Sequence, residues 1–69
     1  MTNSTNMKIR ENIKTYRLTQ NLSQERLGEI VGVSPDYISL IERGKRLPSL
    51  KRLFLIAQAL KVEPFKLLM

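Results

Sequence analysis

The chain has 69 residues, enough for one small domain, and 42% of them are hydrophobic, which excludes a disordered polypeptide. It contains neither Cys nor His, so disulfides, thiolate metal sites and the commonest general base are excluded; we expect no enzyme, no metal and no cofactor. The net charge of +6 favours a polyanionic partner, either nucleic acid or an anionic membrane surface.

The first six residues, MTNSTN, are polar and lack the apolar segment of a signal peptide. No apolar run in the chain reaches the roughly 18 residues that a membrane span needs. The sequence therefore predicts a flexible tail over residues 1–6, a single domain over 7–69, and a cytoplasmic protein with no membrane partner.

Helical spacing of apolar residues predicts a first helix over residues 7–20, with Ile9, Ile13 and Tyr16 on its inner face. Asn6 is a candidate cap at its start. Asn21 can end the helix because asparagine tolerates the left-handed conformation that a helix end needs.

A second helix is expected after Ser23, which can cap it. Its inner face would carry Leu27, Ile30 and Val31. A glycine in the middle of a helix costs about 1 kcal/mol relative to alanine, so Gly28 indicates the close approach of another helix. Gly32 would end the helix, because glycine adopts a positive φ without steric cost.

A third helix is expected after Ser34, with Pro35 in its first turn, Ile38 and Ile41 inward, and Gly44 at its end. The basic turn KRLPS leads to a fourth helix capped by Ser49. The apolar stripe of this helix comprises Leu50, Leu53, Ile56, Ala57 and Leu60. The final segment, PFKLLM, predicts either a short fifth helix or an apolar tail.

The phrases LSQERL, VSPDYISLIERGKRLPS and LIAQAL resemble the helix-turn-helix of the phage-repressor/Xre family. The resemblance runs from about Ile9 to Leu68, although Gly28 stands where the family usually has Ala and Asn21 where it often has Gly. It implies an all-α, five-helix lambda-repressor-like domain with the helix-turn-helix at helices 2 and 3. The implied function is a sequence-specific regulator of transcription, more commonly a repressor, that binds a near-palindromic operator in double-stranded DNA as a homodimer.

The third helix carries poor helix formers on its outer face, which is typical of a helix whose residues are chosen for contact with DNA bases. With Ile38 and Ile41 inward, we predict DNA contacts from Pro35, Asp36, Ser39, Leu40 and Arg43, with Ser34 and Tyr37 at the margins. Structural alternatives exist: Ser34 can serve only as a cap, Asp36 can complement the helix dipole, and Tyr37 can lie half-buried at the rim of the core.

Five of the twelve basic residues fall within ten positions, with no acidic residue among them. They are Arg43, Lys45, Arg46, Lys51 and Arg52, and we predict phosphate contacts there, from Arg43 and Arg46 first. The resemblance implies that Gln24 also bonds a phosphate. It further implies an ion pair between Arg17 and Glu42 that ties the first helix to the end of the third.

The apolar C-terminal residues are the predicted dimer interface: Phe65, Leu67, Leu68 and Met69. In the alternative, Phe65 and Leu68 close the core of the monomer. A second function is also compatible with the sequence. In an antitoxin or other protein-interaction module, these apolar residues would cover a toxin or an antagonist protein.

Overall fold

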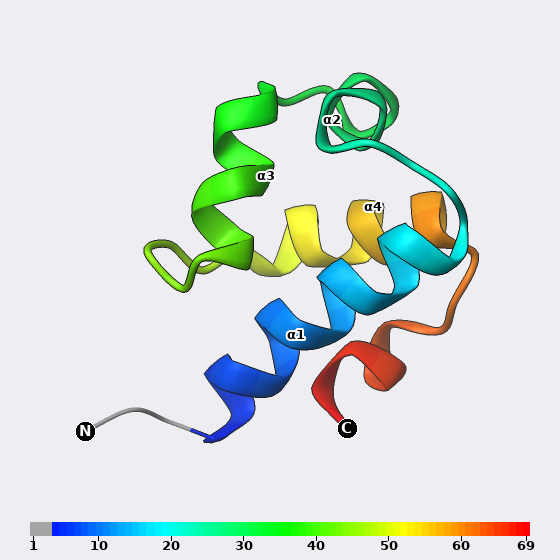
Figure 1. Cartoon of the computed structure of the whole chain (residues 1–69). Coiled ribbons are helices and arrows are strands. Elements are labelled where there is room, and N and C mark those ends of the chain that lie inside the picture. Colours follow the sequence, from blue (N-terminus) through cyan, green and yellow to red (C-terminus); the bar gives the residue numbers. More distant parts are fainter. Residues whose placement is uncertain (1–3) are drawn as a thin grey trace.

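The computed structural model describes residues 4–69, which form four α-helices and one final 3-10 helix (Figure 1). The elements are α1 (Ser4–Thr19), α2 (Gln24–Val31), α3 (Pro35–Glu42), α4 (Leu50–Leu60) and η1 (Pro64–Leu68). The all-α class is as predicted, although the fifth helix is a 3-10 helix rather than an α-helix. No helix in this part of the chain is long and apolar enough to cross a membrane.

Serine hydroxyls begin three of the helices, as the sequence predicted. Each hydroxyl accepts a hydrogen bond from the backbone N–H three residues later, in the pairs Ser23–Arg26 (2.9 Å), Ser34–Tyr37 (3.2 Å) and Ser49–Arg52 (3.2 Å). Each bond satisfies a backbone donor that the first turn of a helix leaves unpaired. The boundaries of α2 and α3, which hold the candidate site, are therefore encoded locally.

Residues in the left-handed conformation follow the helix ends. Asn21 (φ 58°) follows α1, and Gly32 (φ 88°) and Gly44 (φ 74°) follow α2 and α3, as expected. Lys61 (φ 61°) ends α4. The sequence gives no signal for this last residue, because lysine has no preference for the conformation.

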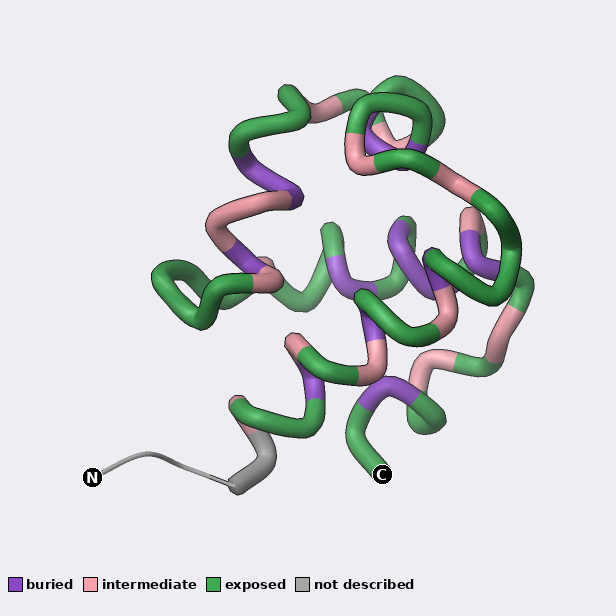
Figure 2. The backbone as a smooth tube through the Cα atoms, in the orientation of Figure 1, coloured by how far each residue is buried: buried purple, intermediate pink, exposed green. Residues whose placement is uncertain are grey.

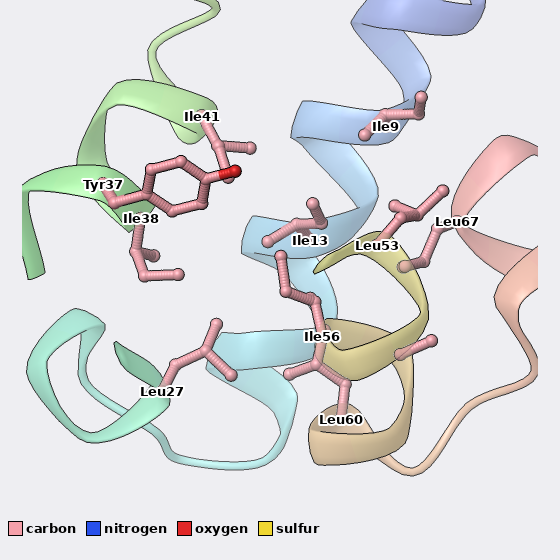
Figure 3. Close-up of a cluster of buried hydrophobic side chains, with 11 residues drawn as sticks. Ile9, Ile13, Leu27, Tyr37, Ile38, Ile41, Leu53, Ile56, Leu60 and Leu67 are labelled. Carbon is pink, nitrogen blue, oxygen red and sulfur yellow. The ribbon is translucent and has the colours of Figure 1, made fainter. Parts of the chain in front are cut away.

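The core lies where all five elements meet, and each of them contributes at least one buried side chain (Figures 2 and 3). The buried hydrophobic residues are Ile9, Ile13, Leu27, Tyr37, Ile38, Ile41, Leu53, Ile56, Ala57, Leu60 and Leu67. The helix-turn-helix formed by α2 and α3 packs on α1 and α4 through this core. One hydrophobic cluster thus holds the two helices of the candidate site.

Three expectations about the helices were wrong. The first helix begins at Ser4, so residues 4–6 are helical and Asn6 is not its cap; residues 1–3 of the predicted tail lie outside the described residues. Ile30 is exposed, because the short α2 is buried only around Leu27 and Gly28. Leu50 is the first residue of α4, and it is exposed because the buried part of this helix begins only one turn later, at Leu53.

Candidate nucleic-acid interface

The turn between α2 and α3 is packed directly against Gly28. The backbone N–H of Val33 donates to the Gly28 carbonyl over 2.9 Å, and a Cβ at Gly28 would lie 2.7 Å from the Val33 carbonyl oxygen. The close approach predicted at Gly28 therefore exists, but it involves the backbone of the turn and not another helix. This contact fixes the direction in which the chain turns from α2 into α3.

The outer face of α3 points to solvent. Ile38 and Ile41 are buried, as predicted, and the helix rests on the core through them. On the opposite side the predicted contact residues are accessible: Ser34, Pro35, Asp36 and Arg43 are exposed, and Ser39 and Leu40 are half-buried. The Nε of Arg43 donates to the hydroxyl of Ser39 over 3.2 Å, so these two side chains form one polar unit on the helix surface.

Tyr37 does not lie at the margin of this face but follows the structural alternative at the rim of the core, where it is more deeply buried than expected. Its side chain belongs to the core, with 8% of the residue exposed. The guanidinium carbon of Arg46 lies 5.1 Å from the centroid of its ring, and that of Arg52 lies 4.9 Å from it. Tyr37 is therefore poorly placed to contact a base and instead lies against two of the predicted phosphate-binding arginines.

The five basic residues after α3 surround the turn that leads into α4. Arg43, Lys45, Arg46, Lys51 and Arg52 are all exposed. Both ion pairs in the described part of the chain are made by other arginines, so no carboxylate there neutralises the turn. The turn lies beside the end of α3 (Figure 1), and its basic side chains make this edge strongly positive.

Arg10 of α1 reaches the same turn, a contact that the sequence did not predict. A Cβ placed on Gly44 would lie 2.7 Å from its Nη1 atom and 3.2 Å from its Cδ atom. The side chain therefore crosses from α1 to lie over Gly44. Nothing in the spacing of Arg10 indicates this contact, because it depends on how α1 packs against the turn.

A polar network joins α1, α2 and α3 behind the exposed face. Arg17 donates from Nε to Oε2 of Glu42 (2.7 Å) and from Nη2 to Oε1 (3.0 Å), which confirms the implied ion pair. Its Nη1 donates to the carbonyl of Leu22 over 2.7 Å. Gln24, the first residue of α2, donates from Nε2 to Oε1 of Glu42 over 3.1 Å. Gln24, for which the resemblance implied a phosphate contact, thus makes a hydrogen bond within the protein through its side-chain amide.

The C-terminal residues divide into two sets. Leu67 is fully buried, so its assignment to the dimer interface was wrong; Phe65, Leu68 and Met69 are exposed. The alternative that Phe65 and Leu68 close the core is also wrong. A 3-10 helix has three residues per turn, so Pro64 and Leu67 share one side and Phe65 and Leu68 another.

The side chain of Asn12 holds this final segment on α1. Its Nδ2 atom donates to three backbone carbonyls, those of Lys66 (3.2 Å), Leu67 (3.0 Å) and Met69 (3.0 Å). The contact carries no signal in the sequence, because an asparagine within a helix is usually a surface residue. It fixes which side of η1 faces the core.

The helix-turn-helix family model matches residues 13–67, which include α2, α3 and the network behind them. The chain belongs to this family. Its members of the Xre, or lambda-repressor-like, type are DNA-binding regulators of transcription, and the predicted family and fold class are confirmed.

Two kinds of family member are similar to the chain over most of its length. The control protein C.SmaI of Serratia marcescens is 43% identical over 60 residues, 87% of this chain and 71% of that protein. The restriction-modification controller protein C.AhdI from Aeromonas hydrophila has a TM-score of 0.86 and 33% identity, covering 93% of both chains. The P22 c2 repressor, solved in complex with a synthetic operator, has a TM-score of 0.82 and 35% identity, covering 87% of this chain and 91% of that one.

Proposed function

We propose that the protein is a sequence-specific repressor of transcription that binds a near-palindromic operator in double-stranded DNA as a homodimer. The observation that carries the proposal is the orientation of α3, whose apolar side is buried through Ile38 and Ile41 while Asp36 and Arg43 point to solvent. The major groove of B-DNA admits one α-helix, and such a helix reads bases with the side chains that it exposes.

The site residues then take two roles. On α3, Asp36 can accept a hydrogen bond from a cytosine amino group, and the Ser39–Arg43 unit can bond base edges, with the Arg43 guanidinium suited to guanine. Beside the helix, Lys45 and Arg46 would bond phosphates and set the register on the duplex. Ser34 and Pro35 shape the start of α3, and Leu40 can contact a thymine methyl group.

Exposed apolar side chains support a homodimer. Six of the ten large hydrophobic residues exposed in the described part of the chain lie on α4, on η1 or directly after η1, and α4 and η1 pack against each other. These six are Leu50, Phe54, Leu55, Phe65, Leu68 and Met69. Large exposed apolar patches on a small protein typically mark an interaction surface. A second copy of the chain would bury this surface and place a second α3 in the next turn of the major groove.

Similarity to C.SmaI and C.AhdI over most of each chain favours control of a restriction-modification system as the biological role. In this role the protein acts in the cytoplasm by occupying DNA and catalyses no reaction. Occupying a promoter excludes the polymerase, which is why repression is the expected outcome.

Selection of bound sites from a random DNA pool tests the proposal. We expect a near-palindrome whose half-sites lie about one helical turn apart. If the dimer neutralises about eight phosphates, the logarithm of the binding constant should fall with the logarithm of salt concentration at a slope of about −7. A flat salt response or an unenriched pool would contradict DNA regulation, and co-purification with an acidic toxin would instead support the antitoxin alternative.

A further inference from the structure

We propose that Tyr37 is a positioning residue for DNA binding, whose buried ring holds the guanidinium groups of Arg46 and Arg52 ready for phosphates. This inference rests on the proposed function, because it assigns the two arginines to the DNA backbone. It gives Tyr37 a role without any contact of its own with a base.

The ring is held in place before DNA arrives. Tyr37 lies in the first turns of α3, its backbone N–H bonded to the Ser34 hydroxyl over 3.2 Å. Its side chain lies beside Ile38 and Ile41 at the rim of the core (Figure 3). A planar group packed in this way keeps one orientation, so it can act as a rigid support for the cations that lie on it.

The two arginines come from two different parts of the chain after α3. Arg46 belongs to the turn itself, and Arg52 lies in the first turn of α4, where its backbone N–H is bonded to Ser49. Both guanidinium carbons lie about 5 Å from the same ring centroid. This separation is within the range of a cation–π interaction. One aromatic ring therefore joins both ends of the basic turn.

The charges of the arginines point to an anion as their ligand. In the described part of the chain, neither guanidinium group has a carboxylate or hydrogen-bond acceptor within bonding distance. Each guanidinium has five N–H donors, and stacking on a ring leaves them available. Two cations that share one ring repel each other, and a phosphate would relieve that repulsion while accepting bonds from both.

Pre-ordering these side chains should raise affinity, because a free arginine loses rotamer entropy when it binds a phosphate. We therefore expect Tyr37→Leu, which keeps an apolar side chain but removes the ring, to weaken DNA binding about tenfold for each subunit. This is the effect expected from the loss of two cation–π contacts. Tyr37→Phe keeps the ring and should bind as the parent does.

The test uses a labelled duplex of mixed sequence at low salt, with Tyr16→Leu as the matched control. Tyr16 also packs against the core, but no arginine in the described residues is stacked on it. If Tyr16→Leu and Tyr37→Leu weaken DNA binding equally, Tyr37 serves only the core and the inference fails. If the parent itself does not bind the duplex, the proposed function fails instead.

A double-mutant cycle separates positioning from stability. Arg46→Ala should weaken binding markedly in the parent and much less in the Tyr37→Leu background, because the ring and the arginine act together. Independent effects in the cycle would overturn the inference. A measurement on the free protein tests the stacking itself. Ring-current shifts of the Arg46 and Arg52 side-chain protons should be present in the parent and in Tyr37→Phe. Absence of these shifts in the parent would overturn the inference, and this result depends neither on DNA nor on the folding of Tyr37→Leu.

Discussion

The Nε atom of Arg17 donates to Oε2 of Glu42 across 2.7 Å and so joins the last turn of α1 to the last residue of α3. Both side chains are nearly buried, with 9% and 4% of their surfaces exposed. The other carboxylate oxygen accepts from Arg17 and from Gln24 of α2. The carboxylate of Glu42 thus connects α1, α2 and α3 and fixes the orientation of α3 relative to the other two helices.

Arg17→Ala should therefore strongly destabilise the domain. The substitution leaves the buried carboxylate of Glu42 without its cation, and such a loss typically costs about 3–5 kcal/mol in the free energy of unfolding. This is a large part of the stability expected for a domain of this size. Urea denaturation followed by circular dichroism measures the change.

Arg26→Ala is the matched control for this change. Arg26 and Glu29 form an ion pair at 3.2 Å within α2, but their side chains are 62% and 61% exposed. Exposed pairs are typically worth about 0–1 kcal/mol, so the loss should be small. Equal effects of the two alanine substitutions would show that the Arg17–Glu42 pair does not hold the helices together.

Lys61→Gly should stabilise the protein. Lys61 ends α4 with φ 61°, a conformation that costs a residue with a side chain about 1 kcal/mol and costs glycine almost nothing. A gain of this size raises the midpoint of thermal unfolding by about 4–8 °C in a domain of this size. The comparison is Asn21→Gly at φ 58°, where we expect a smaller gain because asparagine tolerates this conformation.

Substitutions at Ser39 and Arg46 should change DNA binding in different ways. Ser39→Ala removes the partner of the Arg43 Nε atom on the outer face of α3, so base preference should change at one part of the half-site. Arg46→Ala should weaken binding to all sequences alike and reduce the salt slope by about one for each subunit. Repeating the site selection and the salt titration with both variants checks this, and identical behaviour would refute the division into base-reading and phosphate-binding residues.

Much of the fold follows from short-range signals. The serine caps, Gly32 and the spacing of Ile38 and Ile41 are local features, and each has one favourable structural outcome. Ile30 has the same character as Leu27 in the sequence, yet it is exposed. Whether Ile30 is buried depends on how much of α2 the neighbouring helices cover, and no local sequence pattern predicts this.

The candidate site shows the same limit. Asp36 and Arg43 could be placed on the outer face because they follow from the helical period once the inner residues are known. Tyr37 could be placed at the rim of the core only as an alternative to the outer face, because its ring is covered by Arg46 and Arg52 from outside its own helix. The contact between Arg10 and Gly44 escaped prediction for the same reason.

Substitutions at Phe65 and Leu67 should have separate effects, one on dimerisation and the other on folding. Leu67→Ala removes a fully buried side chain, which should lower the free energy of unfolding by about 2–5 kcal/mol. Phe65→Lys changes an exposed residue of the same 3-10 helix, so the monomer should keep its stability while the dimer weakens, because a charge would enter an apolar interface.

Sedimentation equilibrium and thermal unfolding, performed on both variants and the parent, distinguish the two effects. We expect Phe65→Lys to shift the mass toward the monomer at concentrations where the parent is dimeric, and Leu67→Ala to lower the unfolding temperature when both proteins are dilute. An unchanged mass for Phe65→Lys would move the subunit interface away from η1. Because the spacing of the two α3 helices depends on that interface, the expected separation of the half-sites would then have to be derived again from the new contact.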